Sequence, residues 1–301
     1  MWRVFRMASM PPKMSYARLF EQAVAILKRV GISHAEREAL WILEYGLHVT
    51  RLDVLTHAQE IVEHHACGRT LELLARRATR EPLQYVLGTQ DFCGREFVVE
   101  PGVLIPRPET ELVVEEALAW VQEVPYPLIV DVGTGSGCLA ISVAGGKPDA
   151  TVVAVDQSMT ALHLARINAV RHGLEAHIRW VNGDLLTPLL STQTEGKVTA
   201  IVANLPYISQ ADWECLPPDV KDFEPRRALY GGPDGFDPYR RLFAQVSHFL
   251  TREGVLVIEI GMGQVPLVEE TVSKMGTLRI STIRQDGQGI PRVVCLHHQT
   301  K

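Results

Sequence analysis

The feature that most constrains this chain is a run of apolar residues that passes directly into a glycine-rich turn. Residues 128–132 read Leu-Ile-Val-Asp-Val, and Gly-Thr-Gly-Ser-Gly follows from Gly133 to Gly137. An apolar strand, a turn of this kind and a helix let a bound ligand come close to the backbone. Dinucleotide-binding proteins space their glycines as GxGxxG, whereas here Cys138 stands at the third glycine position. The turn therefore predicts a ligand site at which a dinucleotide is disfavoured.

Further apolar runs predict the rest of an α/β fold. They lie at 128–132, 152–155, 178–181, 198–203 and 255–260, with helical stretches between them. Strands of a parallel sheet that is covered on both faces read as continuous apolar runs of this length. The last two runs, 278–283 and 292–296, have no helix between them and are predicted to pair antiparallel.

The first part of the chain has a different pattern and predicts a small helical bundle. Apolar residues recur at three- and four-residue spacing, and Ser33 with Glu36 forms a predicted capping box for the second helix. A third helix is predicted over residues 61–80, with its arginines, including Arg77, turned outward. We expect an N-terminal domain over residues 1–82 and a C-terminal domain over 83–301. A β-hairpin linker is expected at about 89–100.

Charge and cysteine content narrow the classes of function. Residues 1–88 carry 12 Lys and Arg against 9 Asp and Glu, whereas residues 89–301 carry 18 against 26. The acidic larger part would repel a phosphate backbone, so we expect no direct binding of nucleic acid. No run approaches the ~20 apolar residues of a membrane span, so we expect a cytoplasmic protein. The five cysteines include no CxxC pair, and we expect no metal site.

Acidic residues stand where the first three predicted strands end. Asp131 precedes the glycine turn, Asp156 ends the second strand, and Asp184 follows the third. A carboxylate at the second position can accept hydrogen bonds from both hydroxyls of a ribose. Together with the glycine spacing, these acids resemble those of class I S-adenosylmethionine-dependent methyltransferases. That cofactor carries a positively charged sulfur and no phosphate, so acidic neighbours suit it.

The fourth predicted strand delivers Asn204-Leu-Pro-Tyr207 to the same edge of the sheet. An amide nitrogen is a poor nucleophile because its lone pair is delocalised into the carbonyl group. Acceptors that hold both of its N–H bonds can aim it at a methyl carbon. We expect the side-chain oxygen of Asn204 and the carbonyl of Leu205 to be these acceptors. Pro206 stiffens the turn, and Tyr207 offers an aromatic wall.

The wider sequence closely resembles one family, the release factor glutamine methyltransferases, often called HemK or PrmC. Its motifs stand in unbroken order here: PLQYVLG at 82–88, VLIPRPETE at 103–111, DVGTGSG at 131–137, NLPY at 204–207, EPRRAL at 224–229 and GPDGF at 232–236. The resemblance implies N5-methylation of the glutamine in the Gly-Gly-Gln motif of bacterial class I release factors. It also implies S-adenosylmethionine as methyl donor, a Rossmann-like sheet of seven mostly parallel strands, and a helical domain that docks the release factor.

The resemblance also implies roles for particular residues. The cofactor would be held by Asp131, Gly133, Thr134, Gly135, Ser136, Gly137, Asp156, Asp184, Leu185 and Asn204. Catalysis would depend on Asn204, Pro206 and Tyr207, and the substrate would also contact Leu205, Arg107 and Glu111. The chemistry of Arg107 and Glu111 alone does not assign them to the site, because the two residues could equally form a structural ion pair. We expect the chain to act as a monomer.

Two alternatives stay open, and one of them arises from a departure from the family. The usual tetrapeptide is Asn-Pro-Pro-Tyr, and Leu205 replaces its first proline, which removes a restraint on φ but keeps the accepting carbonyl. Asn-Leu-Pro-Tyr also occurs in enzymes that methylate N6 of adenine in RNA, but the acidic C-terminal part disfavours that substrate. The other alternative is a release-factor-binding module without catalysis.

Overall fold

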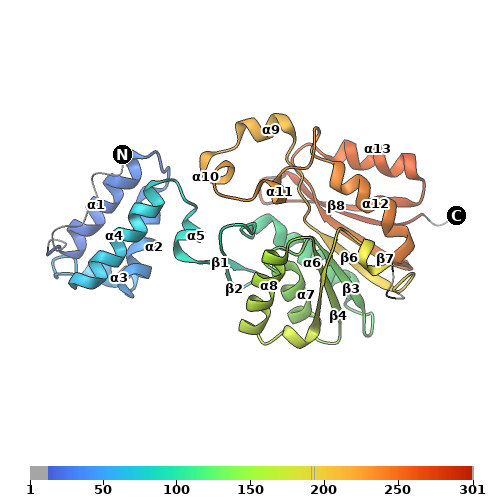
Figure 1. Cartoon of the computed structure of the whole chain (residues 1–301), viewed down its shortest axis with the longest axis horizontal. Helices are drawn as coiled ribbons and strands as arrows, with labels where there is room; N and C mark the ends of the chain where they lie inside the picture. The colour runs from blue at the N-terminus through green and yellow to red at the C-terminus, as the bar shows by residue number, and fades with distance from the viewer. Residues whose placement is uncertain (1–12, 191, 193, 300–301) are drawn as a thin grey trace. The chain divides into compact units, whose positions relative to one another are not determined.

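The computed structural model describes residues 13–190, 192 and 194–299, and the chain forms two compact units (Figure 1). One unit ends at Gly88 and the other begins at Thr89. The sequence places the domain boundary earlier, after Pro82. In the structure Leu83 and Val86 belong to the core of the N-terminal unit, so the short helix that carries them lies on the N-terminal side of the division.

The N-terminal unit is a bundle of helices, as the sequence predicts. The helices are α1 (Tyr16–Arg29), α2 (Ala35–Leu47), α3 (Arg51–Thr56), α4 (His64–Ala78) and α5 (Leu83–Leu87). Their apolar stripes meet in one core that includes Leu19, Leu27 and Leu43. The predicted capping box is wrong. His34 occupies the N-cap of α2, no side chain caps that helix, and Glu36 instead pairs with Lys28 of α1.

Arg77 is also placed differently from the prediction, because its side chain is buried and does not face outward. Its Nε donates to Glu38 Oε2 at 2.6 Å, and its Nη1 donates to the backbone oxygen of Glu81 at 3.0 Å. A guanidinium can be buried where a carboxylate and carbonyls accept its hydrogens. Spacing along α4 could not show this, because Glu38 lies on another helix.

The C-terminal unit contains a seven-stranded sheet in the order β5-β4-β3-β6-β7-β9-β8. Its strands are β3 (Leu128–Val132), β4 (Thr151–Asp156), β5 (Ile178–Asn182), β6 (Val198–Ala203), β7 (Leu250–Glu259), β8 (Leu278–Gln285) and β9 (Pro291–His298). The first five pair in parallel, and β9 pairs antiparallel with both β7 and β8. This confirms the predicted mostly parallel sheet and its antiparallel end.

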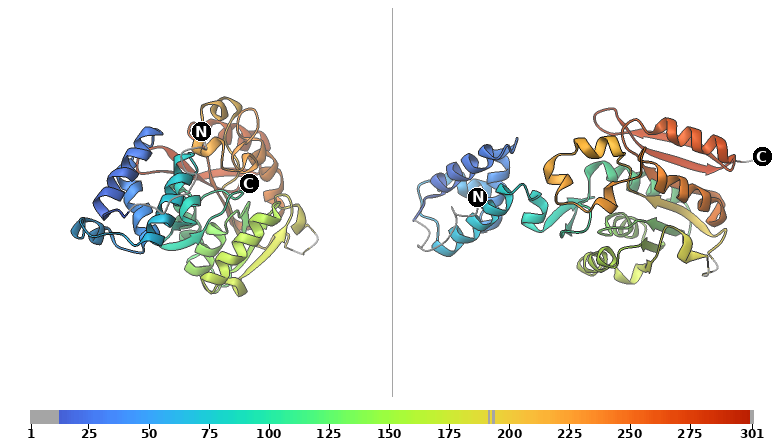
Figure 2. Two further views of the ribbon diagram at one scale, coloured as in Figure 1. Left: turned by 60° about the vertical axis from the view of Figure 1, so that its left-hand side comes forward. Right: turned by 45° about the horizontal axis from the view of Figure 1, so that its top comes forward.

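Helices cover both faces of this sheet (Figures 1 and 2). The longer ones are α6 (Glu111–Val121), α7 (Cys138–Gly146), α8 (Met159–Arg171), α12 (Asp237–Phe249) and α13 (Val265–Met275). The shorter ones are η1 (Pro108–Thr110), η2 (Glu175–His177), η3 (Thr187–Leu189), α9 (Gln210–Cys215), α10 (Pro218–Lys221) and α11 (Arg226–Leu229). Alternate strand residues pack against α6 and α7 on one face and against α12 and α13 on the other. No helix of the described residues is long and apolar enough to cross a membrane.

The predicted hairpin is present as β1 (Thr89–Phe92) and β2 (Arg95–Val98). Cys93 and Gly94 form its two-residue turn, with φ of 48° and 69°. Positive φ at both positions is typical of a type I′ turn, which matches the twist of the strands. Phe92 and Phe97 then lie in the core beneath α6 and α7, so the hairpin is packed into the C-terminal unit.

A buried carboxyl group ties the end of β3 to the start of α7. Asp131 Oδ2 accepts hydrogen bonds from Thr134 Oγ1 at 2.6 Å and from the backbone nitrogen of Ala140 at 3.1 Å. Its Oδ1 has no hydrogen-bond partner among the described residues. Burial raises the pKa of Asp131 from 3.8 to about 7, against the effect of these two donors. Through these two hydrogen bonds, the carboxyl group holds the glycine turn in its shape.

This raised pKa predicts how stability depends on pH. Between pH 3.8 and about 7 the folded chain holds a proton on Asp131 that the unfolded chain has lost. The free energy of unfolding of the native chain therefore falls as pH rises through this range. Asp131→Asn has no carboxyl group to ionise, so its free energy of unfolding lacks this decrease. The free energy of unfolding of the variant, relative to the native chain, should rise between pH 5 and 7 by on the order of 1 kcal/mol per pH unit.

Urea titrations at several pH values measure this difference. Asp149→Asn is the matched control, because the pKa of Asp149 lies below its ordinary value of 3.8 and its relative stability should stay level above pH 5. A level profile for Asp131→Asn would contradict the account of the buried carboxyl group.

Candidate functional site

A large pocket opens at the carboxyl ends of β3, β4 and β6, the edge at which open α/β sheets bind ligands. Its empty space is about 940 Å³ with the open solvent at its mouth included, a size typical of small-molecule sites. Of the residues singled out in the sequence, its walls contain Arg107, Gly133, Thr134, Gly135, Ser136, Asp156, Asp184, Leu185, Asn204, Leu205 and Pro206. Asp131, Gly137, Glu111 and Tyr207 do not line it.

The glycine turn forms one wall of the large pocket. The backbone nitrogens of Gly133 and Thr134 both donate to the carbonyl oxygen of Val155, which fastens the turn to β4. Gly133 has a φ of +77°, and a Cβ atom there would lie 2.9 Å from Leu205 Cδ2. A glycine is therefore needed for the turn to approach residue 205 this closely.

Asp156 ends β4 with its carboxylate in the wall of the large pocket. Its Oδ2 accepts from the backbone nitrogen of Gly135 at 2.9 Å, and its Oδ1 accepts from that of Ser158 at 2.8 Å. Burial raises the pKa of Asp156, whereas these two donors and Arg227 favour the charged form. Each carboxylate oxygen retains a second lone pair, so the group can still accept from a ligand's hydroxyls.

Asp184 and Leu185 follow β5 and form another part of the wall. Arg241 of α12 donates to Asp184 Oδ2. Leu185 has a φ of +51°, which is unusual for a side chain with a Cβ, and it is buried. This conformation leaves an aliphatic surface in the pocket wall and no aromatic one at this position.

Arg107 and Glu111 are not partners of each other, so the alternative of an ion pair between them is wrong. Arg107 Nη2 donates to Glu224, which is buried and also accepts from the backbone nitrogen of Ile105 at 3.2 Å. Glu111 accepts from the backbone nitrogen of Cys93 at 2.7 Å. The spacing within one segment could not reveal this, because Glu224 is far away in the chain.

Asn204 lies where the large pocket meets a smaller one of about 270 Å³. The residues that line both are Leu104, Arg107, Asn204, Leu205 and Ala228. Asn204 Nδ2 donates to Thr110 Oγ1 at 2.9 Å and to Glu259 Oε2 at 3.0 Å. Its Oδ1 accepts no hydrogen bond from the described residues. An uncommitted acceptor therefore stands at the junction of the two pockets.

Thr110, which lines the large pocket, and Glu259, which accepts from Asn204, are two residues of this region that the sequence analysis missed. Glu259 ends β7, is 1% exposed, and also accepts from the hydroxyl of Tyr207 at 3.0 Å. The signal was present in the sequence, since Glu259 is the only charged residue within the apolar run 255–260. A charge in a buried strand requires partners, which makes such a position a candidate for a functional role.

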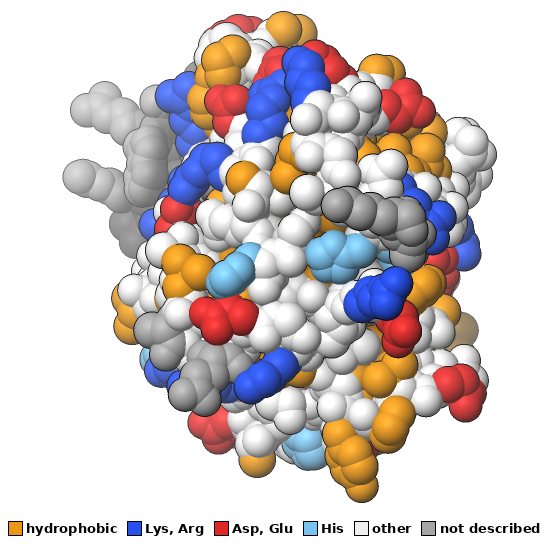
Figure 3. Space-filling model, turned by 90° about the vertical axis from the view of Figure 1, so that its right-hand side faces the viewer, with side chains coloured by type: hydrophobic (Ala, Val, Ile, Leu, Met, Phe, Trp, Pro, Cys, Tyr) orange, Lys and Arg blue, Asp and Glu red, His pale blue; other side chains and the backbone are white. Residues whose placement is uncertain are grey.

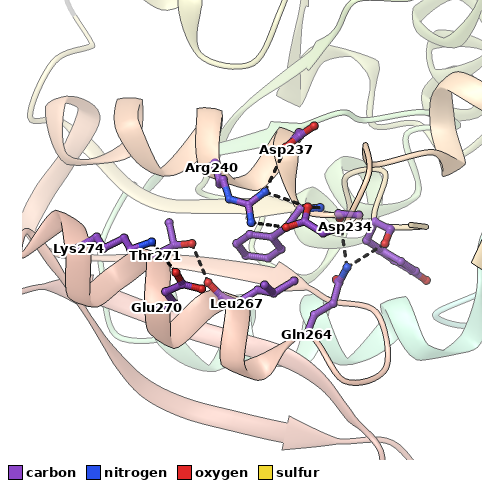
Figure 4. Close-up of polar contacts among 11 residues, drawn as sticks. Asp234, Asp237, Arg240, Gln264, Leu267, Glu270, Thr271 and Lys274 are labelled. Carbon is purple, nitrogen blue, oxygen red and sulfur yellow. Dashed lines mark hydrogen bonds and ion pairs between the residues drawn. The ribbon is translucent and has the colours of Figure 1, made fainter. Parts of the chain in front are cut away.

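The turn that carries Leu205 and Tyr207 is also held through its backbone. The Leu205 nitrogen donates to the hydroxyl of Tyr239 at 3.0 Å, a bond that proline at this position could not make. Gln264 Nε2 donates to the carbonyl oxygens of Tyr207, at 2.9 Å, and of Gly235, at 3.2 Å (Figure 4). A Cβ atom on Gly235 would lie 2.2 Å from that Tyr207 oxygen. The loop at 231–235 thus packs closely against the turn.

The residues present fit S-adenosylmethionine. The carboxylate of Asp156 suits the hydroxyls of a ribose, and the apolar surface of Leu185 suits a base. Asp131, whose Oδ1 is buried without a partner among the described residues, does not line the pocket, so it acts on this site through its hydrogen bonds to Thr134 and Ala140.

Models of known protein families match parts of both units of the chain. A family model described as the PrmC N-terminal domain matches residues 18–88, and one described as the Methyltransferase small domain matches residues 118–215. Among solved structures, the hMettl16 catalytic domain in complex with MAT2A 3′UTR hairpin 1 has a TM-score of 0.54 at 13% identity, covering 80% of this chain and 84% of that chain. This likeness concerns the fold alone.

Curated relatives match over nearly their whole length. The release factor glutamine methyltransferase of Geobacter sulfurreducens is 40% identical over 289 residues, which cover 96% of this chain and 98% of the relative. That of Moorella thermoacetica is 39% identical over 279 residues, covering 93% and 97%. On this similarity, the chain belongs to the release factor glutamine methyltransferase family.

Proposed function

We propose that this chain transfers a methyl group from S-adenosylmethionine to the side-chain amide nitrogen, N5, of the glutamine in the Gly-Gly-Gln motif of bacterial class I release factors. Relatives of that name match almost the full chain, which supports the proposal. We assign docking of the release factor to the N-terminal unit, whose residues match the PrmC N-terminal domain. Since release factors act on ribosomes, we expect the reaction in the cytoplasm.

The observation that carries the proposal is the uncommitted oxygen of Asn204 at the junction of the two pockets. The large pocket suits a nucleoside-sized methyl donor, and the small pocket suits a side chain that enters from another protein. The carbonyl oxygen of Leu205 also accepts no hydrogen bond from the described residues. Two acceptors on adjacent residues can hold both N–H bonds of a primary amide.

The mechanism follows from this grip. When bound, S-adenosylmethionine supplies an electrophilic methyl group on a positively charged sulfur. Asn204 and Leu205 hold the glutamine amide so that its nitrogen, and not its oxygen, faces the large pocket. Withdrawing both hydrogens toward acceptors favours electron density on nitrogen as the new bond forms. The methylated nitrogen then gives up its proton to solvent, because a cationic amide needs no strong base.

Methylation of adenine N6 in RNA is the second candidate, since an exocyclic amino group also offers two N–H bonds. An RNA-binding enzyme needs a basic face. On the face shown in Figure 3, lysines and arginines are interspersed with acidic side chains, and the coloured residues form no continuous basic area. The residues from 89 onward carry 26 Asp and Glu against 18 Lys and Arg. Release factor is therefore the favoured substrate.

The proposal predicts that Asn204→Ala abolishes methyl transfer but not cofactor binding. We expect kcat to fall at least about 100-fold, because an acceptor for the reacting amide is lost. The Kd for S-adenosylmethionine should change at most about fivefold, the value of one neutral hydrogen bond. Mass spectrometry of the Gly-Gly-Gln peptide measures the first effect, and calorimetry measures the second.

Gln122→Ala, which removes an exposed amide that lines neither pocket, is the matched control and should keep native activity. Native turnover by Asn204→Ala would contradict the proposed grip. A native chain that labels RNA and leaves the release factor unmodified would favour the second candidate. A native chain that binds the release factor but methylates nothing would indicate a binding module.

Asp156→Asn should weaken cofactor binding selectively. Hydrogen bonds to a charged group contribute about 1.5–3 kcal/mol, so the Kd for S-adenosylmethionine should rise at least about tenfold. The kcat at saturating cofactor should fall much less, because Asp156 does not contact the acceptor pocket. Asp149→Asn, at the opposite end of β4, provides the control. An unchanged Kd in Asp156→Asn would refute the role of Asp156.

A further inference from the structure

The buried carboxylate of Glu259 has no place in the mechanism above, although it contacts the acceptor residue. It ends β7, follows the apolar residues 255–258, and lines neither pocket. Burying an ionised carboxylate costs several kcal/mol unless its oxygens receive hydrogen bonds. Because this buried carboxylate contacts Asn204, we ask which side chains its hydrogen bonds hold in position.

Three side-chain donors converge on Glu259. They are Thr110 Oγ1 at 2.5 Å, Asn204 Nδ2 at 3.0 Å and Tyr207 Oη at 3.0 Å. Burial raises the pKa of Glu259, whereas the donors favour its charged form. An ionised carboxylate accepts and never donates, so it dictates the direction of each of these bonds.

This direction decides which end of the Asn204 amide faces the pockets. Nδ2 faces Glu259 Oε2 and Thr110 Oγ1 and donates to both. If the Asn204 amide turned over, its Oδ1 would lie against Glu259 Oε2. Two buried acceptors that face each other without a hydrogen between them are strongly disfavoured. The oxygen of Asn204 is thereby committed to the pocket side.

We propose that Glu259 is a positioning residue that presents the oxygen of Asn204 to the substrate, so that the site accepts only a nitrogen that still carries hydrogen. The inference rests on the proposed function and deepens it. A tertiary amide or a carboxylate has no N–H to offer this oxygen, whereas a primary amide does. Glu259 therefore acts on selectivity through Asn204, without touching the substrate.

Gln264 provides a comparison within the same turn. It contacts the backbone oxygens of Tyr207 and Gly235, whereas Arg240 holds the neighbouring Asp234 by ion pairing (Figure 4). Gln264 makes no hydrogen bond with the side chain of Asn204. A loss of stiffness in the turn can therefore be separated from a loss of the orientation of Asn204.

The first test removes the carboxylate. Glu259→Leu should lower kcat about 100-fold, because nothing then prevents the Asn204 amide from turning over. The Kd for S-adenosylmethionine should stay within about threefold, since Glu259 does not line the large pocket. Glu259→Gln should be at least about tenfold more active than Glu259→Leu, because its carbonyl oxygen can still accept from Asn204. Native kcat in Glu259→Leu, or equal loss in both variants, would overturn the proposal.

The second test exchanges the amide at position 204 with the carboxylate at position 259. Asn204→Asp alone places two carboxylates in hydrogen-bond distance, so kcat should collapse. In N204D/E259Q the new amide at position 259 donates to the new carboxylate at position 204, Thr110 can turn its hydroxyl, and a carboxylate oxygen still faces the pockets. We expect this double variant to be at least about tenfold more active than N204D. No gain would overturn the proposal. Because every donor keeps a partner, this variant tests the idea even if Glu259→Leu fails to fold.

Controls separate this proposal from failure of the proposed function. Gln264→Ala loosens the same turn, and adding it to N204D should restore no activity. If the native chain does not methylate a release factor, the proposed function fails and hydrogen exchange still tests Glu259. The side-chain NH2 signal of Asn204, identified by its loss in N204D, should exchange at least about tenfold faster in Glu259→Leu than in the native chain. Equal exchange would refute the role of Glu259.

Discussion

The interaction on which the site depends is the set of hydrogen bonds that Glu259 receives in the interior of the C-terminal unit. One carboxylate joins η1, through Thr110, to the turn after β6, through Asn204 and Tyr207. These segments are far apart in the chain, and each brings a polar group that would be costly to bury alone. Glu259 stabilises these groups by accepting all three hydrogen bonds, and it thereby fixes the direction of each bond. In the proposed site, the oxygen of Asn204 is thus oriented by a carboxylate that lines neither pocket.

The parallel sheet supplies the second constraint. Because β3, β4 and β6 run in one direction, the glycine turn, Asp156 and Asn204 reach the same edge. The turn at Gly133 lies so near Leu205 that a Cβ atom on residue 133 would be 2.9 Å from Leu205 Cδ2, so glycine lets the wall of the large pocket and the turn at 204–207 lie side by side. An ion pair between Arg107 and Glu224 joins the segment before η1 to the segment before α11. The order of the strands therefore brings motifs that are distant in the sequence to one edge of the sheet, where they line two adjoining pockets.

The fold could be predicted from the sequence because its strands are continuous apolar runs and its turns carry glycine at positions of positive φ. Asn204 and Asp156 could be placed for the same reason, since the end of a parallel strand has a known location. The errors concern side chains whose partners lie on other elements. Arg77 finds Glu38, and Arg107 finds Glu224, and no local periodicity encodes such pairs. Glu259 was visible as a charge in an apolar run, but its meaning required Thr110 beside it.

The proposed chemistry requires one side-chain oxygen and one backbone oxygen to grip a glutamine amide beside the methyl donor. A crystal structure with S-adenosylhomocysteine and a Gly-Gly-Gln peptide would show this grip. We expect the glutamine nitrogen to lie about 3 Å from both Asn204 Oδ1 and the carbonyl oxygen of Leu205, with the sulfur on its open side. A glutamine amide that places its own oxygen toward Asn204, or that lies outside the small pocket, would contradict the proposed chemistry.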